Sequence, residues 1–205
     1  MKPKPRGALA RFAASIADAF ALTSGRPEPC ALADLAENTL GRVTGAIQPF
    51  EDRVIASPIT GRPCVYYLVT FEATEGQRVK DEDGIPFLLV DGAARAVIEP
   101  DRTVKYWIDG GRSHVLRSLD EGNPYERGMC ERWRVGRRYP VLFREVILGI
   151  GQQVSVLGAG TREPDPHAQP EGSYRGEVAT RLRIARSRRV PMEIRVMTPL
   201  GPHGL

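Results

Sequence analysis

Cysteine and histidine are scarce in this sequence of 205 residues, which contains three of each. The cysteines form no CxxC pair, so neither a disulfide framework nor a zinc-finger spacing can be drawn from Cys30, Cys64 and Cys130. The histidines show no metal-ligand spacing, and we expect solvated or locally bonded side chains at His114, His167 and His203. We therefore predict no metal site, and the few dispersed cysteines favour a reducing, cytoplasmic environment.

Long apolar runs and aromatic residues are also few. The uncharged stretch over residues 146–161 contains two glutamines and four glycines, so we do not expect a membrane span there. The apolar stretch near the N-terminus is interrupted by Arg11 and Asp18, which argues against a secretory signal. With 21 Gly and 17 Pro against six Phe, six Tyr and two Trp, the composition disfavours a helical bundle and favours many short strands and turns.

Motifs for catalysis and for phosphate binding are missing as well. There is neither a P-loop nor a GxGxxG that follows a strand. Cys64 begins an apolar strand, and we interpret it as a buried structural thiol because a nucleophile would need a base or a positive field. The acidic run Asp81-Glu82-Asp83 is interpreted as a solvated hairpin loop rather than a cation site. We predict a protein that is not an enzyme, with no catalytic residue and no cofactor.

The net charge of +4 is concentrated in the C-terminal part of the chain. Residues 161–205 contain eight Lys and Arg against five Asp and Glu, whereas residues 41–160 contain equal numbers of the two signs. Any binding of phosphate or nucleic acid is therefore expected in the tail rather than in the middle of the chain.

The N-terminal part, residues 1–40, is predicted to be an amphipathic helix followed by a linker. Apolar residues recur at spacings of three and four at Leu9, Phe12, Ile16 and Phe20, which indicates a helix over residues 7–22 with one apolar stripe. This helix either docks on the body of the protein or lies on a membrane surface.

Strand patterns dominate the rest of the chain. The apolar run over residues 64–71 is typical of a buried strand, and residues 87–90 lead into the turn signal Asp91-Gly92. Residues 110–137 have no clean periodicity and predict an inserted loop with a helical portion. Residues 161–175 are predicted to be a Pro-rich linker or loop.

The tail over residues 176–205 alternates apolar and basic residues on two short segments. This pattern predicts a C-terminal β-hairpin with one basic face. The basic face is formed by Arg181, Arg183, Arg188 and Arg189. Whether this hairpin packs on the preceding domain is left open by the sequence.

Four segments occur in an order that resembles the GIDE family. They are residues 56–67 (ASPITGRPCVYY), 86–92 (PFLLVDG), 96–100 (AVIEP), and Glu145 followed by 151–158 (GQQVSVLG). The resemblance covers roughly residues 41–160, and its first segment is the most specific. It implies the family's BAM domain, an elaborated β-barrel related to the OB-fold. We therefore expect a mainly β (α+β) fold, an OB-like β-barrel with an N-terminal helix and a C-terminal β-hairpin.

The best-known member of this family is a mitochondrial E3 ubiquitin ligase that carries transmembrane helices and a RING finger. A RING needs clustered Cys and His zinc ligands, and in this sequence the three residues of each type are scattered. The resemblance therefore implies the barrel without the residues for ligase activity.

Two segments are candidate binding sites. The first is the rigid turn formed by Ser57, Pro58, Thr60, Gly61 and Arg62. It is either a recognition loop on the barrel rim or a turn that fixes the register of the following strand. The second is the basic patch with an aromatic residue formed by Trp133, Arg134, Arg137 and Arg138. It is either a contact site or a solvated loop with an anchoring tryptophan.

Three functional hypotheses follow. The first is a non-catalytic GIDE-like binding module, a protein-interaction adaptor or a membrane-adjacent sensor, with a protein as its partner and a possible membrane-surface contact through residues 7–22. The second is an OB-like binder of single-stranded nucleic acid that uses the barrel and the basic tail. The third is a component of a ubiquitin-ligase-like system that has no RING of its own.

Overall fold

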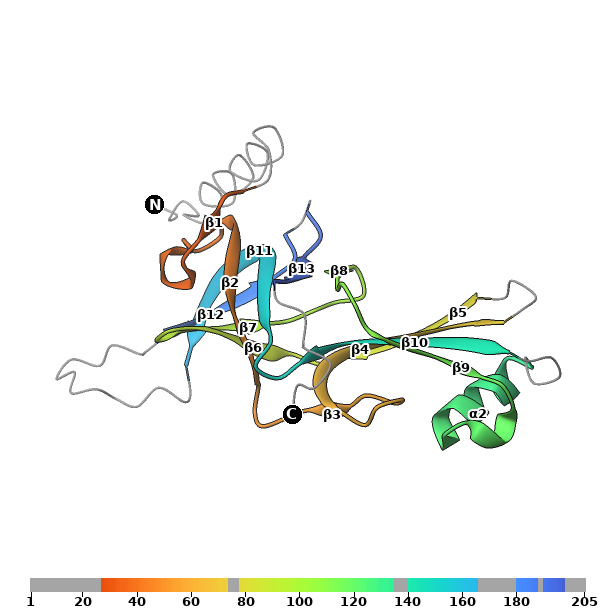
Figure 1. Ribbon diagram of the computed structural model, residues 1–205. Coiled ribbons are helices and arrows are strands. Elements are labelled where there is room, and N and C mark those ends of the chain that lie inside the picture. The colour runs from red at the N-terminus through yellow and green to blue at the C-terminus, as the bar shows by residue number, and fades with distance from the viewer. Residues whose placement is uncertain (1–26, 74–77, 135–139, 166–179, 188–189, 198–205) are drawn as a thin grey trace, which may run out of the picture.

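Five strands close into a barrel, and a second sheet extends from it (Figure 1). The computed structural model describes residues 27–73, 78–134, 140–165, 180–187 and 190–197. The barrel strands are β2 (Leu40–Pro49), β6 (Phe87–Asp91), β7 (Ala94–Ile98), β11 (Gln153–Pro164) and β12 (Thr180–Ala185). The expected mainly β fold is confirmed.

The barrel has the topology of an OB-fold. Its strands follow in the order β2, β6, β7, β12 and β11, and β11 pairs back onto β2. All neighbouring strands are antiparallel except β7 and β12, which run in parallel. This closed five-stranded Greek-key arrangement confirms the OB-like barrel that we expected.

Alternating side chains fill the barrel. Val43 and Ile47 of β2 point inward with Val154 and Val156 of β11, because successive residues of a strand face opposite sides of the sheet. Gly45 allows a close contact between two strands, since a Cβ at this position would lie 2.6 Å from the carbonyl oxygen of Val90 in β6. Two preceding elements, β1 (Pro29–Cys30) and the 3₁₀ turn η1 (Leu32–Asp34), extend this region, and Leu32 is buried in the same core.

The C-terminal tail does not form the predicted hairpin. β12 and β13 (Glu193–Val196) do not pair with each other; both are antiparallel to β11 and follow one another along the same edge of that strand. The alternation correctly indicates two strands, but it carries no information about their partners. Because β12 completes the barrel, the barrel extends beyond residue 160.

The second sheet is made from two insertions into the barrel. Its strands are β3 (Ile55–Ala56), β4 (Pro63–Ala73), β5 (Arg78–Gly84), β9 (Arg112–Leu116) and β10 (Val141–Gly149). β3 to β5 lie between β2 and β6 in the chain, whereas β9 and β10 lie between β7 and β11. The two insertions join where β4 and β10 pair along nearly their whole length.

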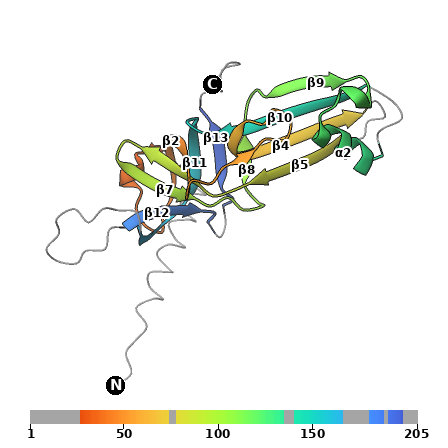
Figure 2. The same cartoon turned by 90° about the horizontal axis from the view of Figure 1, so that it is seen from below.

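Helix α2 (Pro124–Arg132) packs on one face of this sheet and closes a second hydrophobic core. The core contains Phe71, Phe143, Leu116 and Met129. We call β3, β4, β5, β9, β10 and α2 together the arm. Figure 2 shows β9 and β5 at opposite edges of the arm. The helix confirms the predicted helical portion within residues 110–137, which also contain the 3₁₀ turn η2 (Leu119–Glu121).

One further sequence prediction is wrong, and two others concern residues that the structure does not describe. The acidic run Asp81-Glu82-Asp83 lies within β5 and not in a hairpin loop. The predicted helix over residues 7–22 lies outside the described residues, as does most of the predicted linker, from residue 166 onward. In the part of the chain that the structure describes, no helix has the length and apolar character needed to cross a membrane.

Candidate functional site

The predicted turn over residues 57–62 is anchored by Glu145, whose contact with the turn the sequence did not predict. Glu145 of β10 is buried, and its Oε1 accepts a hydrogen bond from the backbone N of Ile59 at 2.8 Å. Its Oε2 accepts from Thr60 Oγ1 at 2.6 Å and from Ser57 Oγ at 3.3 Å. A buried carboxylate needs such donors, because burial without them would strongly disfavour the charged form.

The same turn is also tied to helix α2. Asn123, the N-cap of α2, accepts a hydrogen bond from the backbone N of Glu126 and donates to the carbonyl oxygens of Pro58 and Ile59, each at 3.4 Å. Gly61 has a φ of 67°, which favours glycine. The turn therefore belongs to the arm, where Ser57 is buried and Arg62 is half-buried. This geometry supports a turn that holds the arm together.

Cys64 begins β4 directly after this turn. Its side chain is fully buried, and this burial raises the pKa of the thiol to about 12, with Glu145 adding to the effect. A thiol that stays protonated at neutral pH is a poor nucleophile. The described residues contain no group of three or more His, Cys, Asp or Glu side chains that could hold a metal ion.

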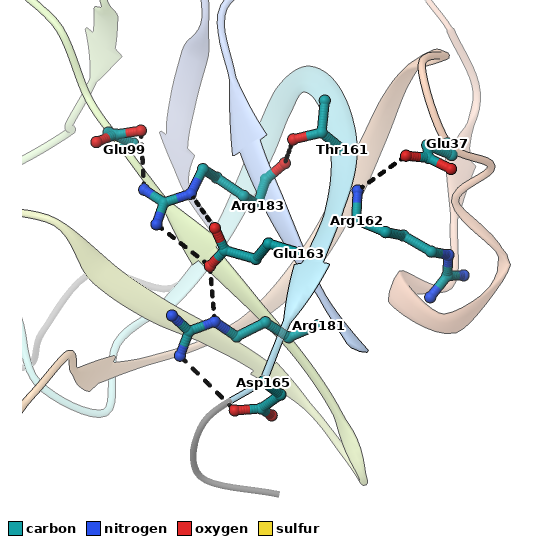
Figure 3. A network of polar contacts seen from close by, with 8 residues as sticks. All are labelled: Glu37, Glu99, Thr161, Arg162, Glu163, Asp165, Arg181 and Arg183. Carbon is teal, nitrogen blue, oxygen red and sulfur yellow. Dashed lines mark hydrogen bonds and ion pairs between the residues drawn. The ribbon is translucent and has the colours of Figure 1, made fainter. Parts of the chain in front are cut away.

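The described part of the predicted basic tail face is an ion-pair network (Figure 3). Glu163 of β11 accepts hydrogen bonds from Arg181 Nε at 2.8 Å and from Arg183 Nε at 2.6 Å. Arg183 also pairs with Glu99 at 2.9 Å, and the guanidinium of Arg181 lies 5.1 Å from the ring centre of Phe50.

These contacts change the electrostatics of the tail. Hydrogen bonds from Arg183, and then from Arg181, hold the pKa of Glu163 below its ordinary value, although partial burial opposes this shift. Both arginines thus have carboxylate partners within the protein, and less of their charge is available to an anionic ligand. The other two predicted residues of this face, Arg188 and Arg189, lie outside the described residues.

The predicted patch around Trp133 is described only in part. Trp133 is the C-cap of α2 and is exposed, as is Arg134, which has a φ of 54°. Arg137 and Arg138 lie outside the described residues, so the described part of this patch consists of Trp133 and Arg134.

A second exposed tryptophan lies at the edge of the barrel sheet. Trp107 ends the short strand β8 (Lys105–Trp107), which pairs in parallel with β13. The guanidinium of Arg195 lies 5.5 Å from the Trp107 ring centre, and Met197 is exposed just after β13. The alternation in β8 could have indicated this outward tryptophan, but its pairing with Arg195 could not be predicted from local sequence.

A groove of about 680 Å³ lies between the arm and the segment that connects β7 to β8. Tyr66 and Tyr106 stack in it with ring centres 3.8 Å apart, and Tyr66 donates a hydrogen bond to Glu82 at 2.7 Å. The charged residues of its wall are Lys80, Glu82, Asp83, Asp101 and Arg102. Burial raises the pKa of Tyr106 and of Tyr66, with Glu82 adding to both effects. The walls carry both signs of charge and therefore do not select one ligand charge strongly.

The face of the arm opposite α2 carries exposed aliphatic side chains. Val115 of β9 and Leu142 of β10 are direct cross-strand partners, and both are exposed. On the other face their neighbours Leu116, Val141 and Phe143 are buried in the core with α2. Sequence alternation indicates which residues share a face, but not which face a helix covers.

Comparisons with protein-family models, with curated proteins and with solved structures found no match for this chain. The resemblance to the GIDE family therefore stays a prediction.

Proposed function

We propose that this chain is a non-catalytic binding module that recognises a protein partner through its arm. The observation that carries the proposal is the arm itself, a second sheet with its own core. The five-stranded barrel closes without the arm strands, so the two insertions are not needed to complete it. An ordered projection with one helix-covered face and one face that displays aliphatic side chains suits contact with another macromolecule.

The exposed aliphatic pair favours a protein as the partner. Val115 and Leu142 lie side by side across two strands, and such a pair contributes binding energy when a partner removes it from water. Charged residues of both signs surround the pair on the same face, with Arg144 on β10 and Glu72 on β4. An apolar contact with a polar rim is the usual anatomy of a protein interface. In the GIDE-like interpretation, the module is an adaptor, either beside a membrane or within a ubiquitin-ligase-like system.

Site-specific photo-crosslinking in the native cell tests this proposal. A photoreactive amino acid is placed at Leu142 and Trp133 of the arm and, as a control, at Val54, an exposed apolar residue outside the arm. We expect one partner protein to be crosslinked from an arm position and not from position 54. This partner, once purified, should bind the full chain of 205 residues in titration calorimetry. If no protein is crosslinked from the arm, or if the crosslinked protein does not bind when purified, the proposal is wrong.

One observation favours a second candidate, the binding of single-stranded nucleic acid. The exposed ring of Trp107, with Arg195 beside it, offers a stacking surface next to a cation, as single-strand binders use. Fluorescence anisotropy with a labelled oligonucleotide at low and at near-physiological salt tests it, with Trp107→Ala as the variant. Binding that survives near-physiological salt and is lost in this variant would support the second candidate.

A further inference from the structure

The sheet of the arm has two edges of very different character. β5 forms one edge, and most of its seven residues are charged, namely Arg78, Lys80, Asp81, Glu82 and Asp83. Charged side chains on an edge strand oppose pairing with another chain. β9 forms the other edge with the sequence RSHVL, which contains no acidic residue and only one arginine. By this criterion the β5 edge is protected and the β9 edge is not.

β9 is open along its outer side. It pairs with β10 from Arg112 to Leu116, and among the described residues no other strand pairs with it. Its first four residues are exposed. An edge strand directs alternate N–H and C=O groups away from its neighbour, and these groups can pair with an added strand.

The side chains beside this edge define what an added strand would meet. Val115 and its cross-strand partner Leu142 are exposed on the face opposite α2, and Ser113 is paired with Arg144 on the same face. The guanidinium of Arg144 donates a hydrogen bond to the carbonyl oxygen of Gly110 at 2.9 Å, so it reaches across to the start of β9. The edge therefore presents an apolar pair near its C-terminal end and a cation near its N-terminal end.

We infer that β9 accepts an extended segment of the partner protein as an additional antiparallel strand. The segment has an apolar residue opposite Val115 and, two positions later, an acidic residue opposite Ser113 that meets Arg144. Residues directly opposite one another in antiparallel strands have Cβ atoms about 4.5–5.5 Å apart, so the apolar residue covers Val115. This inference rests on the proposed function and specifies the surface and the chemistry of the partner.

A second copy of this chain fits the same edge less well. Two copies of β9 paired with each other would supply only arginine and histidine as charged groups, because β9 contains no acidic residue. Arg144 would then meet no opposite charge, and like charges on neighbouring strands disfavour pairing. The segment of a different protein is therefore the occupant that the charges favour.

Selection from a phage library of random twelve-residue peptides tests the inference, with the purified full chain as the target. We expect enrichment of peptides with an apolar residue, any residue and then Asp or Glu. Binding of the enriched peptides, measured by fluorescence anisotropy, should weaken about tenfold or more in Val115→Lys. Val54→Lys is the matched control and should bind as the unchanged chain does, because Val54 is 46% exposed and Val115 is 47% exposed.

A charge-reversal pair and hydrogen–deuterium exchange make the test specific for Arg144 and for the backbone of β9. Arg144→Glu should weaken binding of the acidic peptide, and a peptide with Lys in place of the acidic residue should restore it. Hydrogen–deuterium exchange at residues 112–116 should slow when the peptide binds, which a contact through side chains alone would not cause.

Three results would overturn the inference. They are failure to enrich any peptide, equal binding by Val115→Lys, and a dimer in light scattering that Val115→Lys dissociates, which would assign the edge to a second copy. The outcome is separable from that of the proposed function. If the protein crosslinked from the arm still binds Val115→Lys, the β9 edge is excluded while the function of the arm stands.

Discussion

Replacing Glu145 with alanine should destabilise the protein more than most single substitutions. Glu145 is 3% exposed, and its carboxylate accepts hydrogen bonds from Ile59, Thr60 and Ser57. Glu145→Ala removes all three bonds at once and leaves a cavity under the turn over residues 57–62. The turn would then lose its main connection to β10.

The magnitude follows from the three donors. A hydrogen bond to a charged group contributes about 1.5–3 kcal/mol, and the bond from Ser57, at 3.3 Å, should contribute least. Because the substitution removes the charge itself, the cost comes from unpaired donors and lost packing rather than from a buried charge. We expect a loss of about 3–5 kcal/mol in the free energy of unfolding, or roughly 6–20 °C in Tm.

Glu145→Gln is the matched control, because it keeps the shape and removes only the charge. The amide oxygen can still accept from Ile59 N, and the hydroxyls of Ser57 and Thr60 can rotate to accept from the amide NH₂. We expect a loss of about 1–2 kcal/mol. Urea unfolding followed by circular dichroism measures both variants. A loss below about 1 kcal/mol for Glu145→Ala, or equal losses for the two variants, would refute the reasoning.

Three further predictions address the ion pairs, the cysteines and the barrel. The pKa of Glu163 is held below its ordinary value of 4.5, chiefly by the hydrogen bond from Arg183. The ion pairs of Glu163 therefore stabilise the protein fully above pH 4.5, and this stabilisation is lost as the pH falls through the lowered pKa of Glu163. Glu163→Gln should therefore lower the free energy of unfolding by about 1 kcal/mol at pH 7, and the difference should shrink towards pH 3 in urea titrations. In the native protein at pH 8, iodoacetamide should label the half-buried Cys30 faster than Cys64, and equal labelling in peptide mass spectrometry would contradict the burial of Cys64. Gly45→Ala should lower the free energy of unfolding by about 1–3 kcal/mol, because the added Cβ would meet a backbone carbonyl of β6. Thermal melts measure this loss, and an unchanged Tm would show that the barrel can widen at this position.

Individual strands could be predicted in good part from local patterns. The apolar run over residues 64–71 lies within β4, and the pattern over residues 153–158 lies at the start of β11. These signals are reliable because a strand buried on both faces must be apolar over several consecutive residues. The same signals do not distinguish a strand of the barrel from a strand of the arm, and β4 belongs to the arm.

The pairing of distant segments could not be predicted. The prediction of a hairpin in the tail is wrong because both tail strands pair with β11, and no local turn signal indicates this partner. Glu145 is separated from the turn it anchors by 85 or more residues, so no spacing rule connects them. Of the predicted binding residues, Thr60 and Ser57 do meet in one place, but their common partner is this carboxylate.

Closure of the barrel by β12 also fixes an order of events on the ribosome. β2 begins at Leu40 and β12 ends at Ala185, so at about 5–20 residues per second the first barrel strand waits roughly 7–30 seconds for the last. Both central strands of the arm, β4 and β10, are already synthesised by Gly149. The nascent chain can therefore fold its arm while β7 still exposes an unpaired edge, and during that interval the edge of the unfinished barrel is the part that most needs a chaperone.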